Sequence, residues 1–339
     1  MTRRWVISRY ASVTWAEGRI RIVSAASGAA LETADLGLVR LIHAFAEPAT
    51  VAEVIAILEL GVPSLLEARM KDLMLAGILV PAGSPEPAAA EHWDAAALAF
   101  HRAARAAAPP AWRADAGGLA AVGGAVPIPI RVPPPRPDAL WSALQARASC
   151  RAWSDAPIAL ADFERLLSFS AADRGPDGTT GSRPYPSGGA IHSLDIYPVL
   201  GVGAVEGLAA GIHRFDPSGP ALIPLAMGEA AALPLLGCAG RSVEGAPPPV
   251  LLVITSRIRG PSAKYGPLGY DLVLKEVGGL CQTLHLVAAG LGLAGCMLGG
   301  AASAAAFRRA CGGADLSDPV VGEFALGLPA AARKPEPSI

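Results

Sequence analysis

Charge and aromatic side chains are both scarce in this sequence of 339 residues. Charged residues make up 17% and aromatic residues 5%, and 28 basic residues are balanced by 29 acidic ones, for a formal net charge of −1. Such a balance leaves no basic stripe that could neutralise phosphates, so a nucleic acid is not expected as a partner. Hydrophobic residues reach 52%, more than a disordered chain carries. Most of the chain is therefore predicted to fold around sizeable cores.

Cysteine is also scarce, and its pattern excludes a disulfide framework. The five cysteines are odd in number and none forms a C-x-x-C pair; they are Cys150, Cys238, Cys281, Cys296 and Cys311. The residues after Met1 lack the apolar region of a signal peptide. Together these features predict a reducing, cytoplasmic location. Cys281 and Cys296 are expected to act as small buried hydrophobic residues.

A hydrophobic run that could cross a membrane is interrupted by glycine. Residues 286–307 are uncharged and long enough to span a bilayer. The run contains five glycines, each of which costs about 1 kcal/mol of helix propensity relative to alanine: Gly290, Gly292, Gly295, Gly299 and Gly300. We therefore expect this run to break into shorter pieces, and no membrane as a partner.

The first part of the chain has the pattern of a small helical domain. Residues 19–23 alternate as a strand, and apolar side chains then recur at helical spacing over residues 36–45. A second helix is predicted from Thr50, a third over residues 64–76, and the first strand of a wing over residues 78–80. This order predicts a winged-helix-like domain in residues 1–85. The domain either binds a peptide or only packs, and its third helix carries too few cations to read DNA.

A linker and a larger α+β domain are predicted to follow. Residues 86–137 are rich in alanine and proline and contain one predicted helix, residues 88–108. From residue 138 to residue 339, apolar strands mix with helical segments. The helices are predicted at residues 139–147, 160–169 and 270–291, and the strands at residues 196–202, 250–255 and 323–328. No G-x-G-x-x-G or P-loop lies between a strand and a helix, which argues against a dinucleotide-binding fold.

Three short segments of the larger domain carry candidate binding chemistry. Arg147, Ser149 and Arg151 place two guanidinium groups and a hydroxyl on alternate residues, which suits phosphate and polyol oxygens. A glycine pair at residues 188–189 lets the backbone approach a flat ligand closely. The third segment, residues 264–270, precedes the longest predicted helix. His192 and His285 stand apart from other ligand types, so no metal site is expected.

In this order and at this spacing, the three segments resemble the nitroreductase-like flavoproteins. The resemblance extends to the SagB-type dehydrogenases, which oxidise azolines in the biosynthesis of thiazole- and oxazole-modified peptides. Its most specific parts are R-x-S-x-R at residues 147–151, P-S-G-G-A at residues 186–190 and K-Y-G at residues 264–266. The segment from Trp93 to His101 is similar to a helix that precedes the catalytic domain in those proteins. The chain departs from the pattern at Asp271, and at residues 278–279, which are Gly-Gly.

The resemblance implies a homodimer with FMN at the subunit interface, and it assigns the cofactor-binding residues. Arg147, Ser149 and Arg151 are expected to hold the phosphate and ribityl chain. The partner chain is expected to present four residues to the flavin, and two glycines are expected near the reactive edge of the flavin. The full set is Arg147, Ser149, Arg151, Pro186, Ser187, Gly188, Gly189, Gly299, Gly300 and Arg333. Arg333 is expected to add a cation for the phosphate.

Lys264 and Tyr265 match the Lys-Tyr pair that is regarded as catalytic in the azoline oxidases. Aromatising an azoline removes a hydride to the flavin and a proton to a base. A lysine against an apolar flavin face can be desolvated enough to be partly neutral, and a neighbouring phenol can position it or relay the proton. The residues do not decide which of the two groups takes the proton.

The resemblance predicts an FMN-dependent azoline dehydrogenase acting on a precursor peptide, with a cyclodehydratase as partner and oxygen as electron acceptor. The winged-helix-like domain is then expected to bind a leader peptide, which pairs with an exposed strand edge at residues 19–23. Two alternatives stay open: an NAD(P)H-dependent nitroreductase acting on another substrate, and a flavin-free scaffold that binds peptides.

Overall fold

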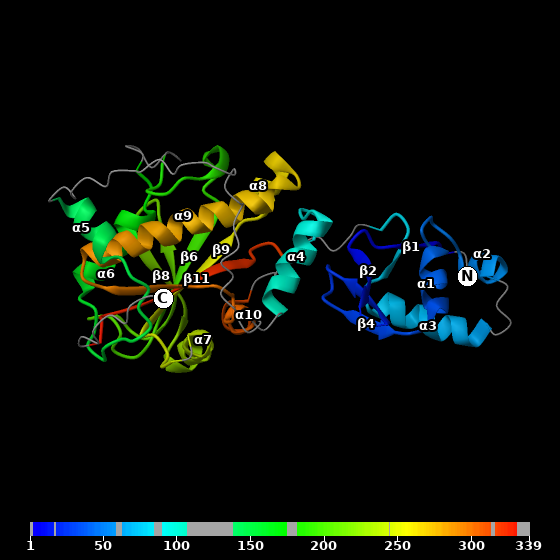
Figure 1. Cartoon of the computed structure of the whole chain (residues 1–339), viewed down its shortest axis with the longest axis horizontal. Helices are drawn as coiled ribbons and strands as arrows, with labels where there is room; N and C mark the ends of the chain where they lie inside the picture. Colours follow the sequence, from blue (N-terminus) through cyan, green and yellow to red (C-terminus); the bar gives the residue numbers. More distant parts are fainter. Residues whose placement is uncertain are drawn as a thin grey trace, which may run out of the picture.

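The computed structural model describes residues 3–16, 18–58, 63–84, 90–106, 138–174, 182–243, 245–312 and 316–330. Figure 1 shows a small N-terminal unit, a larger C-terminal unit built around one sheet, and helix α4 between them. The fold combines helices with mainly antiparallel strands, which confirms the α+β prediction.

The N-terminal unit contains two small antiparallel sheets and three helices. Its elements are β1 (Trp5–Ile7), β2 (Ala11–Ala16), β3 (Arg19–Ser24), β4 (Ala30–Thr33), α1 (Leu36–His43), α2 (Val51–Leu58), α3 (Pro63–Leu75) and β5 (Leu79–Pro81). Thr50 and Glu53 form the predicted capping box, since Thr50 Oγ1 accepts from the Glu53 N–H and Glu53 Oε2 accepts from the Thr50 N–H. Phe45, Leu73 and Ile78 are fully buried in the core of this unit.

Two expectations for the N-terminal unit were wrong in detail. β3 is the central strand of the sheet β2-β3-β4, so residues 19–23 offer no exposed edge. β5 pairs with β1 instead of opening a wing, through Ile7 opposite Leu79. Apolar alternation identifies a strand, but it does not say which strand lies beside it.

Helix α4 (Ala95–Ala106) joins the two units, and it begins later than the predicted residue 88. Asp94 caps it, because its Oδ1 accepts from the N–H groups of Ala96 and Ala97, each at 3.0 Å. On one side, the Arg102 guanidinium donates to the Ala25 carbonyl of the N-terminal unit. On the other side, His101 Nδ1 lies 2.6 Å from the Tyr270 hydroxyl of the larger unit.

The larger unit is one six-stranded sheet with helices on both faces. Its elements are α5 (Ala139–Ala146), α6 (Leu160–Ala171), η1 (Gly188–Ala190), β6 (Leu194–Leu200), β7 (Gly211–Asp216), β8 (Ala221–Met227), α7 (Glu229–Ser242), β9 (Val250–Ser256), α8 (Arg259–Tyr265), α9 (Leu268–Gly290), β10 (Ala294–Leu298), α10 (Ala304–Cys311) and β11 (Val320–Gly327). The strand order is β10-β11-β9-β6-β7-β8, with antiparallel neighbours throughout.

The two faces of the sheet bury separate cores. The long helix α9 and helix α6 cover one face, where Leu280 and Leu284 pack with Ile254 and Phe324. Helices α7 and α10 cover the other face (Figure 1). Every residue of β9 is buried because this strand is covered on both sides.

The uncharged run at residues 286–307 breaks as its glycines predicted. It forms the end of α9, strand β10 and the first residues of α10. Within the described ranges, α9 is the helix long and apolar enough to cross a membrane. Its apolar residues, among them Val277, Leu280 and Cys281, are buried against the sheet as the helical spacing predicted.

Candidate active site

The glycine pair lies in a strained loop before β6. Gly189, Ala190 and His192 all have left-handed backbone conformations, with φ values of 61°, 55° and 49°. For residues with a side chain, this conformation costs about 1–2 kcal/mol. The turn is closed by the Ser187 hydroxyl, which accepts from the His192 N–H at 2.9 Å. Strain of this kind is common at binding and catalytic sites.

Lys264 and Tyr265, at the end of α8, lie directly against this loop. The ammonium group of Lys264 donates to the carbonyl oxygen of Gly189 at 3.3 Å, and it lies 5.6 Å from the centre of the Tyr265 ring. A Cβ atom on Gly189 would lie 2.3 Å from Tyr265 Oη and 2.6 Å from Lys264 Nζ. Two segments 75 residues apart thus meet within one chain, and the glycine is required for the approach.

The chain leaves the candidate catalytic pair accessible. Lys264 is exposed and Tyr265 is half-buried. The desolvation expected for Lys264 is therefore not supplied by the side chains of this chain.

Buried hydrogen bonds that involve Glu276 and Ser256 hold the end of the loop at Ser193. Glu276, on α9, is 4% exposed, and its Oε2 accepts from the Ser193 hydroxyl at 3.0 Å. The Ser256 hydroxyl donates in turn to Ser193 Oγ at 3.1 Å. Burial raises the pKa of Glu276, and the hydroxyls of Ser193 and Ser187 oppose that rise.

A buried ion pair between Arg183 and Asp173 adjoins the residue Leu194, just after the loop. Arg183 donates to Asp173 Oδ1 at 2.9 Å and to the carbonyl of Leu194 at 2.9 Å. Burial alone would raise the pKa of Asp173, but the hydrogen bond and charge of Arg183 outweigh it, so the pKa is lowered. Burial raises the pKa of Tyr185 to about 12, and its hydroxyl accepts from Arg183 at 3.0 Å.

Neither Glu276 nor Arg183 was among the candidate residues. Glu276 could have been found, because it is an acidic residue on the apolar stripe of a helix that includes Val273, Val277 and Leu280. A buried carboxyl group at such a position needs hydrogen-bond or ion-pair partners, and buried ionisable groups with such partners often belong to a functional site.

The Arg147 motif lies beside the first residues of β10. Arg147 is the C-cap residue of α5. Ser149 forms an isolated β-bridge with Gly295, whose carbonyl accepts from the Cys150 N–H at 2.9 Å. The positive charge of Arg147 reaches His285 on α9, where it adds to burial in lowering the pKa of that histidine. Ser149 and Arg151 are exposed, so their polar groups are open to a ligand.

The glycine pair Gly299-Gly300 follows the other end of β10. A rise of about 3.3 Å per residue puts Gly299 roughly 13 Å from Gly295. Both glycines are exposed, and a Cβ atom on Gly299 would meet nothing within 4 Å. The chain's own packing therefore does not require glycine there. Arg333 lies outside the described residues.

The predicted cofactor-binding residues thus fall into separate groups along α9. A Cβ atom on Gly188 would lie 3.2 Å from Leu272 near the start of the helix, whereas the charge of Arg147 acts on His285 near its end. Thirteen residues of helix separate these two positions, a distance of about 20 Å. The Lys-Tyr pair and the glycine loop are brought together within the chain, and the Arg147 motif lies apart from them.

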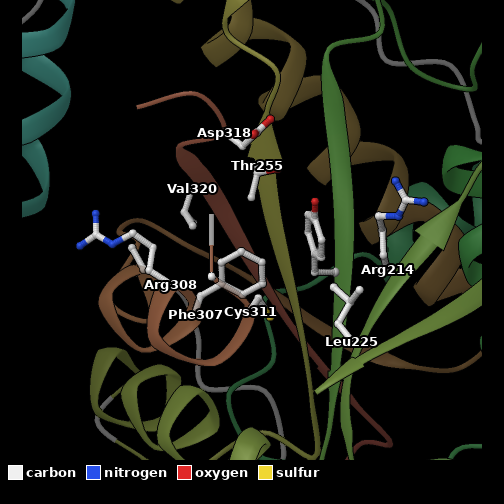
Figure 2. Close-up of a pocket in the computed structure, with 11 residues that line it drawn as sticks. Arg214, Leu225, Thr255, Phe307, Arg308, Cys311, Asp318 and Val320 are labelled. Atoms are coloured by element: carbon white, nitrogen blue, oxygen red, sulfur yellow. The ribbon is translucent and has the colours of Figure 1, made fainter. Parts of the chain in front are cut away.

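Of two cavities in the structure, one adjoins the candidate site and the other does not. One, of about 280 Å³, opens beside α8 and is lined by residues 91–94 together with Ser262, Ala263, Gly266 and Pro267. The other, of about 290 Å³, lies on the opposite face of the sheet, beside α10. Phe307, Arg308 and Cys311 line it from α10, and Figure 2 shows Leu225 and Arg214 across from Phe307. None of the candidate site residues lines this second cavity.

The histidines and cysteines that the sequence singled out lie in the interior. His192 and His285 are buried, as are Cys281 and Cys296, and all five cysteines are free. Within the described part of the chain, no three His, Cys, Asp or Glu side chains gather as metal ligands would.

The comparison with known proteins decides the family. Residues 144–328, more than half of the chain, match the Nitroreductase family. The chain belongs to this family. The nitroreductase-like fold was therefore predicted correctly, and the oxidoreductase class follows from it.

Two relatives illustrate the match. A nitroreductase-type protein of Methanocaldococcus jannaschii, MJ1384, is 29% identical over 147 residues, which cover 43% of this chain and 71% of that protein. A chain of the Escherichia coli microcin synthetase complex McbBCD, solved with truncated pro-MccB17 bound, has 19% identity and a TM-score of 0.52. That match covers 70% of this chain and 95% of the other, and it shows a shared fold.

Other nitroreductases match more weakly. A Bacteroides fragilis nitroreductase solved with bound FMN has 15% identity and a TM-score of 0.37, over 60% of this chain and 95% of that one. A protein from Anabaena variabilis, also of nitroreductase type, has 21% identity and a TM-score of 0.47 over 56% of this chain. This chain spans 38% of the length of the Anabaena protein.

Proposed function

We propose that this protein is an FMN-dependent dehydrogenase that oxidises a peptide-borne azoline to an azole. The observation that carries the proposal is the contact of Lys264 and Tyr265 with the Gly188-Gly189 loop. This contact joins two of the three motifs that resemble the SagB-type azoline dehydrogenases, within a nitroreductase-family chain.

The residues present fit FMN as the cofactor. Arg147, Ser149 and Arg151 supply guanidinium and hydroxyl donors for a phosphate and a ribityl chain. Gly299 exposes backbone that a side chain would cover, which suits the approach of a flat ring system. Bound FMN supplies the hydride acceptor of the oxidation. Arg333 is proposed as a further phosphate ligand.

A homodimer explains why the predicted ligands are separated in one chain. In the proposal, Pro186, Ser187 and the glycine pair of one protomer complete the FMN site built on Arg147 of its partner. Exposed apolar side chains on α5 support an interface next to Arg147: Leu140, Trp141 and Leu144 are 59%, 41% and 41% exposed. Gly278 also supports it, because this exposed glycine within α9 meets nothing within 4 Å at its Cβ position.

Lys264, in its neutral amine form, is proposed to take the proton that leaves the azoline ring carbon. Its Nζ is held at the Gly189 carbonyl, and the Tyr265 ring lies beside it, so either group can be aligned on a substrate bound over the loop. Lys264 is exposed in a single chain. Substrate, cofactor and partner subunit are therefore the groups that exclude water from it.

The N-terminal unit is proposed to recognise the leader of a precursor peptide. The cavity beside α8 is lined by residues 91–94, which connect the N-terminal unit to α4, and by residues adjoining Lys264. A peptide bound by the N-terminal unit can therefore extend along this cavity toward Lys264 and Tyr265. The outer strands β2 and β4, not β3, offer edges for strand addition. A cyclodehydratase partner and a cytoplasmic location are part of the proposal. The peptide substrate is supported by the shared fold with a chain of McbBCD, a complex solved with truncated pro-MccB17 bound.

An absorbance spectrum tests the cofactor part of the proposal. The purified protein, or the protein reconstituted with FMN, should be yellow and release FMN on denaturation. Oxidation of NAD(P)H with a nitroaromatic compound, but no oxidation of azoline peptides, would favour the alternative nitroreductase activity. A protein that binds precursor peptide but stays colourless with added FMN would be a scaffold.

A further inference from the structure

A buried carboxyl group holds one end of the strained loop. Glu276 Oε2 accepts from the hydroxyl of Ser193, the residue that follows the loop, at 3.0 Å. At the other end, the Ser187 hydroxyl accepts from the His192 N–H. The three left-handed residues of the loop lie between these two serines.

The surroundings of Glu276 are polar but enclosed. Arg183 contributes a positive charge from the side, and its guanidinium also donates to the Leu194 carbonyl. Ser256 completes the chain of hydroxyl groups, and it is fully buried. A buried polar network of this kind fixes the geometry of the backbone that it contacts.

The loop in turn fixes Lys264. The carbonyl of Gly189 is the acceptor for Lys264 Nζ, and this carbonyl points as it does because Gly189 is left-handed. In the described contacts, Glu276 reaches Lys264 through the loop and not directly.

We infer that Glu276 is a positioning residue for Lys264, because its hydrogen bond with Ser193 holds the end of the loop whose Gly189 carbonyl orients the lysine ammonium group. The inference rests on the proposed function for the catalytic role of Lys264. The position of the lysine itself can be tested without a substrate.

The experiment measures the reactivity of Lys264 toward a reductive-methylation reagent in the full-length protein, by mass spectrometry of its peptide. Glu276→Gln keeps the size of the side chain but replaces one acceptor by a donor. We expect Lys264 to be labelled about threefold faster or more, as one hydrogen bond to it weakens. Lys71 and Lys275 serve as internal standards, and Glu164→Gln, an exposed substitution on α6, is the matched control.

Ser193→Ala provides a second variant should Glu276→Gln fail to fold, because it removes the hydroxyl through which Glu276 holds the loop. Faster labelling of Lys264 in a folded variant, together with a lower kcat at unchanged KM and FMN content, supports the inference. Labelling at the wild-type rate in a folded variant overturns it, even if thermal stability falls. Altered labelling in a protein that oxidises no azoline supports the positioning role and contradicts the proposed function.

Discussion

The ammonium nitrogen of Lys264 lies 3.3 Å from the carbonyl oxygen of Gly189, and the Tyr265 hydroxyl occupies the space that a side chain at position 189 would need. Both candidate catalytic groups are therefore packed against one left-handed glycine. The site depends on the absence of a Cβ atom there.

Gly189→Ala should disable the site without unfolding the chain. The new methyl group would overlap Tyr265 Oη and Lys264 Nζ, so both side chains must move, and we expect kcat to fall at least about tenfold. Steady-state kinetics on an azoline peptide measures the change. Gly203→Ala is the matched control, because Gly203 has a φ of 65° and an open Cβ position. Equal activity of the two variants would contradict the assigned site.

Arg147→Ala should lower the affinity for FMN. A charge-assisted hydrogen bond contributes about 1.5–3 kcal/mol, so its loss corresponds to a roughly 10- to 150-fold larger dissociation constant for FMN. Fluorescence titration of the apoprotein with FMN gives this constant. Arg241→Ala, on the opposite face of the sheet in α7, should leave it unchanged. An unaltered constant in Arg147→Ala would show that the phosphate is held elsewhere.

Glu276 should make stability depend on pH in a defined direction. Its pKa is raised above 4.5 in the folded chain, so the folded state binds the proton more tightly than the unfolded state does. The stabilisation is present below pH 4.5 and is lost as the pH rises through the folded pKa. The unfolding free energy of wild type minus that of Glu276→Gln should therefore decrease as the pH rises from about 4, as measured by urea denaturation. A difference that increases with pH would contradict the raised pKa.

Deleting residues 1–85 should weaken processing of a full-length precursor, chiefly through KM. Binding remote from the chemistry is lost, whereas a short leaderless azoline peptide should still be oxidised. The deletion removes Tyr10, whose hydroxyl donates to the Ala90 carbonyl, so the FMN content of the truncated protein is the control. Unchanged KM for the precursor in a flavin-loaded truncation would remove leader recognition from the account.

Local signals in the sequence predicted much of the fold. The helical stripe of α9, the capping box at Thr50 and the glycines that divide residues 286–307 are all short-range patterns, and the structure confirms each. Strand neighbours were not predictable in this way. β5 pairs with β1 across more than 70 residues, and β3 lies between two strands, because pairing depends on tertiary packing.

The candidate site was predictable in its parts but not in its connections. The sequence motifs identified Lys264, Tyr265 and the glycine loop. The contact between them arises because α8 lies beside the loop. Glu276 carried a visible signal, a charge on an apolar stripe, but its partner Ser193 comes from the residue before β6, and Ser256, the partner of Ser193, comes from β9. Only the folded chain joins these two hydroxyl groups and the carboxyl in one network.

Incubation of the FMN-loaded protein with an azoline-containing peptide, followed by mass spectrometry of the peptide, tests whether the protein is an azoline dehydrogenase. The account predicts that each oxidised ring loses the mass of two hydrogen atoms. It also predicts that Lys264→Ala stays yellow but loses this activity, while Lys71→Ala retains it. Intact azolines after incubation with flavin-loaded wild-type protein, or a loss in Lys264→Ala of less than about tenfold, would contradict the account.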